Sequence, residues 1–103
     1  MELKQTLKRG DVLVRRYEYN NVLYSFYQVY AIKGNKVELY PLQAKNRGCV
    51  GFMQYEVEPI IPKGYLIKNL ISKRFNKYGE ISIDKSNLCL YDKNRQYIEY
   101  HDY

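Results

Sequence analysis

The sequence contains no tryptophan, a single histidine and only two cysteines, and these scarcities exclude several kinds of site. Cys49 and Cys89 lie far apart and form no C-x-x-C pair, so with His101 as the only histidine a zinc site lacks its ligands. In a reducing compartment both thiols are expected to stay free. The sequence therefore predicts no metal site and no cofactor.

Long apolar runs are also missing. No run reaches the roughly 18 apolar residues of a membrane-spanning helix. The N-terminal residues 1–5 are not followed by the apolar core of a signal peptide. We therefore expect a cytoplasmic protein that makes no contact with a membrane.

Motifs that carry catalysis are not found either. The serines lack a glycine-rich elbow, and the six glycines are scattered as turn residues rather than gathered in a phosphate-binding loop. Cys49 or Cys89 with His101 is the only thiol–imidazole combination, and its spacing gives no support to a catalytic pair. Most acidic residues fall at expected strand ends or turns, where solvated charge is their usual role. The sequence thus predicts no catalytic residue and a protein that is not an enzyme.

Tyrosine is the residue that the chain has in excess, with 13 among 103 residues. Tyrosine favours strands and combines an apolar ring with a polar tip. The length suits one domain, and 46% hydrophobic with 27% charged residues is typical of folded globular proteins. We expect residues 1–103 to form a single β-rich domain.

Turn residues divide the chain into short segments with strand-like alternation. We expect strands over residues 11–17, 24–33, 36–41, 52–57, 70–75, 80–84, 87–91 and 96–100. Residues 43–51 are polar and are expected to form an exposed loop. A helix over residues 67–74 is the alternative to the strand over 70–75, because its apolar residues also fit one helical face.

Three turns predict three hairpins. Gly34-Asn35 joins the second and third segments, Tyr78-Gly79 joins 70–75 to 80–84, and residues 92–95 join the last two segments. In the first of these hairpins we expect Val37 and Leu39 to face the core. Lys36, Glu38 and Tyr40 are then expected on the other side, as in a sheet that is solvated on one face. Seven or eight short strands predict an all-β fold with at most one short helix, a small SH3-like barrel or a sandwich built from hairpins.

The charge is unbalanced. The chain has 17 basic and 11 acidic residues, a formal net charge of +6 and a sequence pI near 9.3, which favours an acidic partner. Basic residues are concentrated in residues 1–51 and in residues 63–77. The second of these ranges contains no acidic residue. Our candidate partner-binding residues are Arg9, Arg15, Arg16, Tyr17, Tyr19, Lys73, Arg74 and Lys77.

Arginine beside tyrosine on a β surface is a pattern suited to single-stranded nucleic acid. Guanidinium groups hold phosphates and aromatic faces stack bases. Arg15, Tyr17 and Tyr19 share one face of the first strand by alternation. Tyrosines also fill the cores of small barrels, and tyrosine with arginine is equally common at protein interfaces. The pattern leaves nucleic-acid and protein partners open.

Several segments resemble a group of small proteins from bacteriophages and other bacterial mobile elements. They are Gly10-Asp11-Val12-Leu13-Val14, Tyr19-Asn20, Phe26-Tyr27-Gln28-Val29 and Leu90-Tyr91-Asp92, with Tyr97 and Tyr100. The chain has Asp92-Lys93 at the last turn, where such proteins commonly have aspartate followed by glycine.

The resemblance implies a function and a setting. Such proteins often block host defence by stoichiometric binding, as anti-CRISPR proteins do, so we expect a non-catalytic inhibitor of an RNA-guided nuclease in the host bacterial cytoplasm. Its partner would be the CRISPR effector protein or the phosphates of the guide RNA. The alternative is a nucleic-acid-binding small β-barrel module that contacts single-stranded RNA or DNA. The protein is expected to be a monomer or a homodimer.

Overall fold

The computed structural model describes residues 3–64 and 69–101 and has an all-β architecture, which confirms the predicted fold class. One short helix, α1 (Leu3–Thr6), precedes the strands. The strands are β1 (Val12–Glu18), β2 (Val22–Lys33), β3 (Lys36–Leu42), β4 (Ala44–Gly51), β5 (Gln54–Pro59), β6 (Ile71–Arg74), β7 (Ser82–Ile83), β8 (Ser86–Asn87), β9 (Cys89–Leu90) and β10 (Tyr97–Tyr100).

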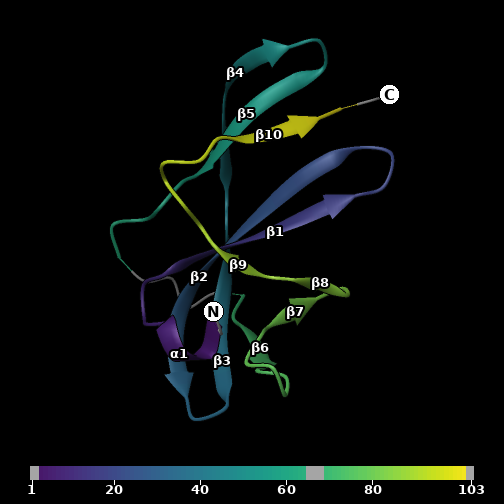
Figure 1. Cartoon of the computed structure of the whole chain (residues 1–103). Coiled ribbons are helices and arrows are strands. Elements are labelled where there is room, and N and C mark those ends of the chain that lie inside the picture. The colour runs from purple at the N-terminus through teal and green to yellow at the C-terminus, as the bar shows by residue number, and fades with distance from the viewer. Residues whose placement is uncertain (1–2, 65–68, 102–103) are drawn as a thin grey trace.

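The larger sheet is open and branched rather than closed into a barrel. Its main path is β4-β5-β10-β2-β1-β9, and β3 pairs with both β2 and β6. The long strand β2 causes the branching: β1 pairs along one edge, whereas β10 and β3 pair at successive positions along the other. The β4–β5 hairpin therefore lies at one end of the molecule and the β2–β3 turn at the opposite end (Figure 1). The molecule measures 44 × 31 × 25 Å.

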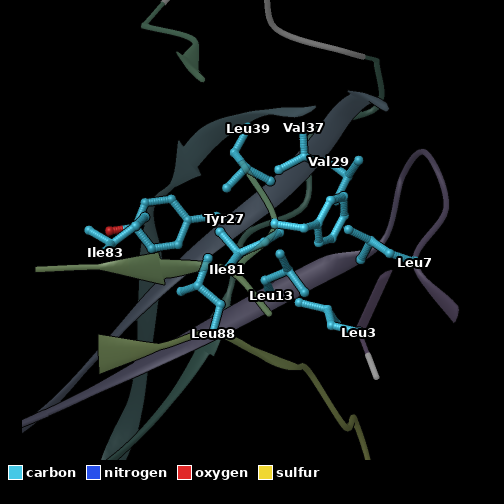
Figure 2. Packing of buried hydrophobic residues seen from close by; sticks show 11 residues of the cluster. Leu3, Leu7, Leu13, Tyr27, Val29, Val37, Leu39, Ile81, Ile83 and Leu88 are labelled. Atoms are coloured by element: carbon cyan, nitrogen blue, oxygen red, sulfur yellow. The ribbon is translucent and has the colours of Figure 1, made fainter. Parts of the chain in front are cut away.

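Both faces of the β1–β2 hairpin are covered by apolar side chains. Leu13 and Tyr27 are paired across the hairpin and pack into one cluster, drawn in Figure 2, which α1 closes with Leu3. The neighbouring pair, Val14 and Phe26, packs into a second cluster on the opposite face. The β1–β2 hairpin thus contributes side chains to two small hydrophobic cores, one on each face.

Tyr40 shows the consequence of this two-sided burial. Val37 and Leu39 are buried, as predicted, but Tyr40 was expected on a solvated face and is instead 0% exposed. It lies opposite Gln28, and its hydroxyl donates a hydrogen bond to the Gln28 side-chain oxygen. The Gln28 amide nitrogen donates to the Gly10 carbonyl at 3.1 Å. Because these bonds satisfy the polar atoms, the tyrosine can be buried.

The helix predicted as an alternative over residues 67–74 is wrong where the structure describes it. Residues 71–74 form strand β6, which confirms the strand prediction, and residues 67 and 68 lie outside the described part. The predicted pairing of this strand with residues 80–84 is also wrong, since β6 pairs with β3. β7 pairs instead with β8 around Asp84-Lys85, whose φ angles of 49° and 68° are those of a tight hairpin turn.

The third predicted hairpin is not formed either. Residues 92–95 do make a turn, in which the Asn94 N–H donates to the Asp92 carboxylate at 2.9 Å. The flanking strands then diverge: β9 pairs with β1, whereas β10 pairs with β5. Leu88 and Tyr97, on either side of this turn, are buried in different clusters on opposite faces of the sheet. This burial draws the two strands apart.

Residues 43–51, predicted as a loop, form strand β4 from Ala44 onward, so the loop assignment is wrong although the segment is exposed as expected. The main chain pairs with β5 despite the polar composition, and the register shifts twice, between Asn46 and Gly48 and between Cys49 and Gly51. The next strand starts at residue 54 instead of 52, since Phe52 and Met53 form the connecting turn.

Candidate nucleic-acid interface

The predicted binding residues fall into two separate groups in the structure. One group lies on the β1–β2 hairpin and consists of Arg15, Arg16, Tyr17 and Tyr19. The other lies near the β2–β3 turn and β6 and consists of Arg9, Lys73, Arg74 and Lys77. Figure 1 shows the free end of the β1–β2 hairpin projecting away from the β2–β3 turn.

The arginines of the β1–β2 hairpin are occupied by contacts within the protein. Arg15 and Arg16 follow each other in the strand and therefore lie on opposite faces. The Arg15 side chain is only 12% exposed, with its guanidinium 5.6 Å from the Tyr17 ring centre and 3.7 Å from the Asp84 carboxylate. Arg16 contacts the Glu18 carboxylate at 2.5 Å. A hydrogen bond with Tyr24 and the charge of Glu18 raise the pKa of Arg16, so this guanidinium stays charged and paired.

A row of cations crosses three strands at the opposite end. Lys33 lies directly opposite Lys36 across the Gly34-Asn35 turn, and Lys36 lies directly opposite Arg74 in β6. Opposite residues of an antiparallel pair project from the same face, and neighbouring strands are about 4.8 Å apart, so the three charges span about 10 Å. Lys73 lies opposite Val37 and therefore projects from the other face of β6. We call this end of the molecule, with the row and with Arg9, Lys73 and Lys77, the basic end.

Three of these cations have no acidic partner among the described residues. Lys33 contacts the Glu38 carboxylate at 3.1 Å. Within residues 3–64 and 69–101, no carboxylate forms a salt bridge with Lys36, Arg74 or Lys77. Like charges that face each other across a strand pair are destabilising. The basic end therefore retains a positive potential that an anionic ligand would relieve.

Aromatic rings lie beside two of the cations at this end of the molecule. The Arg9 guanidinium is 5.2 Å from the centre of the Tyr30 ring, and both line a shallow depression with Lys33. On the β6 side, the Lys77 ammonium is 5.1 Å from the centre of the Tyr78 ring, and this ring is exposed. Cations and aromatic rings thus occur side by side at two places at this end of the molecule.

Hydrogen bonds hold the segments of the basic end together. The Lys4 ammonium donates to the Asn35 side-chain oxygen at 2.9 Å, and the Lys4 N–H donates to the Gly79 carbonyl at 2.9 Å. The Phe75 N–H donates to the Asn35 carbonyl at 3.0 Å. These bonds join α1, the β2–β3 turn and the turn after β6, so the three segments that carry the basic end are fixed relative to one another.

Four residues at the basic end were not among the predicted binding residues: Tyr30, Lys33, Lys36 and Tyr78. A signal for two of them was present, because a two-residue Gly34-Asn35 turn places the residues before and after it face to face. No local signal pairs Lys36 with Arg74, since β6 lies more than 30 residues further along the chain. That contact depends on the tertiary fold.

A second exposed feature is the β4–β5 turn, at the opposite end of the molecule (Figure 1). Phe52 is 81% exposed and Val50 is 47% exposed. Met53 has a φ of 59°, a conformation that costs a residue with a side chain on the order of 1 kcal/mol or more. We call residues 49–53 the apolar tip. Exposed apolar side chains gathered at one place often mark a protein contact.

The described residues contain no group of three or more histidine, cysteine, aspartate or glutamate side chains that could hold a metal ion. Cys49 and Cys89 are exposed and free. Among the described residues, no helix has the length and apolar character needed to cross a membrane. No protein-family model matches the chain, and no similar curated protein or solved structure was found.

Proposed function

We propose that the protein is a non-catalytic nucleic-acid-binding protein whose basic end holds the phosphate backbone. The observation that carries this proposal is the row formed by Lys33, Lys36 and Arg74 on one face of three neighbouring strands. A nucleic-acid backbone carries one negative charge per nucleotide, so each of the three cations can pair with a phosphate. Bound phosphates would also remove the repulsion between the three cations.

The aromatic rings favour a nucleic acid over an acidic protein surface as the partner. Nucleic acids offer bases that stack on exposed rings in addition to phosphates that pair with the cations. Tyr30 beside Arg9 and Tyr78 beside Lys77 provide such rings within the basic end. The combination therefore supports nucleic acid more strongly than charge alone does.

The proposal predicts a salt-dependent affinity with a defined slope. Each phosphate contact with a single strand contributes about 0.7 to the slope of log affinity against log salt, so three contacts predict a slope of about −2. Lys36→Ala should weaken binding and reduce the steepness of the slope by about 0.7. The measurement is fluorescence anisotropy of a labelled single-stranded oligonucleotide over a series of salt concentrations.

The matched control is Lys93→Ala, which removes an exposed lysine from the turn before β10, outside the basic end. It should leave both the affinity and the slope close to those of the unaltered protein. Binding that does not change with salt, or equal effects of the two substitutions, would refute phosphate binding by the basic end.

Inhibition of an RNA-guided nuclease is the second candidate function, and the apolar tip supports it. An inhibitor of such a complex needs a contact with the effector protein in addition to any contact with guide RNA. Phe52 and Val50 offer apolar surface for that contact at the end away from the cation row. A pocket on the effector could take the Phe52 ring while the basic end lies on the guide RNA.

This second candidate predicts a protein complex that survives removal of free nucleic acid. The tagged protein should recover one CRISPR effector from a bacterial lysate after nuclease treatment, as identified by mass spectrometry, and Phe52→Ser should abolish the recovery. Ile61→Ser is the matched control, because Ile61 is an exposed apolar residue, 53% exposed, outside the apolar tip. Recovery of nucleic acid alone, lost on nuclease treatment and in high salt, would contradict the inhibitor hypothesis.

A further inference from the structure

The exposed ring of Tyr78 has no role in holding the fold together. It is 60% exposed, although the chain on either side of it is anchored in the core by Phe75 and Ile81. Among the described residues, its ring contact is the cation–π approach of the Lys77 ammonium. An aromatic ring kept in solvent between two buried anchors is available for a ligand.

The turn that carries Tyr78 is rigid. The Asn76 side-chain oxygen accepts hydrogen bonds from the Tyr78 N–H at 2.8 Å and from the Glu80 N–H at 2.9 Å. The Gly79 N–H donates to the Asn76 carbonyl at 2.9 Å, and the φ of Gly79 is 74°, which glycine adopts without strain. The backbone beneath the ring is thus fixed before any ligand binds. A preorganised surface loses little conformational freedom on binding.

The turn that carries the ring is bonded to the segments that carry the cation row. Arg74 precedes Phe75, whose N–H donates to the Asn35 carbonyl, and Asn35 is the neighbour of Lys36. Lys4 bonds to Asn35 with its ammonium and to Gly79 with its N–H, which ties the Tyr78 turn to the β2–β3 turn. These bonds hold the Tyr78 turn at the same end of the molecule as Lys36 and Arg74, next to the chain segments that carry them.

We propose that Tyr78 stacks on a base, so that the basic end binds single-stranded nucleic acid in preference to a duplex. This inference rests on the proposed phosphate binding and adds the structural class of the ligand. Bases in a duplex are already stacked and paired, whereas those of a single strand are free to lie on an aromatic ring. Stacking uses the face that all four bases share, so the preference would be for single strands of any sequence.

The test compares three labelled DNA ligands by fluorescence anisotropy. They are an oligothymidylate of about 12 nucleotides, within the usual site size of small β domains, an abasic strand of the same length, and a duplex of the same length. Tyr78→Ala should weaken binding of the oligothymidylate by about 5- to 150-fold, the loss expected for one stacked base. It should leave the affinities for the abasic strand and the duplex unchanged.

Tyr78→Phe is the conservative variant and should bind the oligothymidylate nearly as well as the unaltered protein, because stacking needs the ring and not the hydroxyl. Unchanged binding of the oligothymidylate by Tyr78→Ala would overturn the stacking role. An equal loss for the abasic strand would overturn it too, because that ligand has no base to stack. If the unaltered protein binds none of the three ligands, the proposed phosphate binding is wrong. If it binds the abasic strand but Tyr78→Ala does not weaken binding of the oligothymidylate, only the stacking role is wrong.

Discussion

Lys36→Glu combined with Arg74→Glu is expected to reduce the affinity for nucleic acid by about 100-fold or more. A hydrogen bond to a charged group contributes about 1.5–3 kcal/mol, so each lost phosphate contact costs about 10- to 100-fold. The two carboxylates also repel the phosphates that the cations would hold. These two residues lie opposite each other at the centre of the basic end, so the effect should exceed that of any single substitution.

The comparison that isolates this effect uses a control with the same change in net charge. Lys45→Glu combined with Lys93→Glu changes the net charge by the same amount but alters β4 and the turn before β10, outside the basic end. Affinity for a labelled single strand is measured by anisotropy at one fixed low salt concentration. If both double variants lose affinity equally, binding depends on the overall charge and the basic end is not the site.

Leu13→Ala and Phe26→Ala are each expected to destabilise the fold strongly, although the two side chains lie on opposite faces of the same hairpin. Leu13 is fully buried in the cluster that includes Leu3 and Leu7, and Phe26 is buried in the cluster on the other face. Truncation of a buried leucine costs about 2–5 kcal/mol and of a buried phenylalanine about 3–5 kcal/mol. A sheet solvated on one face would show a large effect for only one of the two.

Urea unfolding followed by circular dichroism measures both effects. Leu90→Ala is the control, because Leu90 is 42% exposed in β9 and its truncation should change the free energy of unfolding by much less. Phe26→Leu keeps most of the volume and provides a measurable variant if Phe26→Ala does not fold. A small effect of Phe26→Ala and Phe26→Leu alike would mean that the second cluster is not a core.

Local patterns in the sequence were enough for the elements near the centre of the fold. The Gly34-Asn35 turn and the alternation on either side of it predicted the β2–β3 hairpin, and Val37 and Leu39 are buried as expected. These predictions succeed because a two-residue turn fixes which residues face each other within a few positions of the chain. The same local rule brings Lys33 opposite Lys36.

Tyrosine and arginine content alone did not predict which of these side chains are available for binding. Composition drew attention to Arg15 and Arg16, but alternation along a strand puts them on opposite faces, and each has an acidic neighbour within the protein. Tyr40 was expected in solvent because its neighbours alternate, yet it is buried and hydrogen-bonded to Gln28. Whether a polar face is open or covered depends on which distant segments pack against it.

Local sequence patterns therefore predict the all-β class and most of the strand segments. The Gly34-Asn35 turn also carries the signal that places Lys33 opposite Lys36. The tertiary structure alone decided that β6 pairs with β3, that β9 and β10 separate after residues 92–95, and that Arg74 completes the row beside Lys36. The physical reason is that turn residues specify local geometry, whereas the choice of a strand's partner depends on burying apolar side chains contributed by segments far apart in the chain.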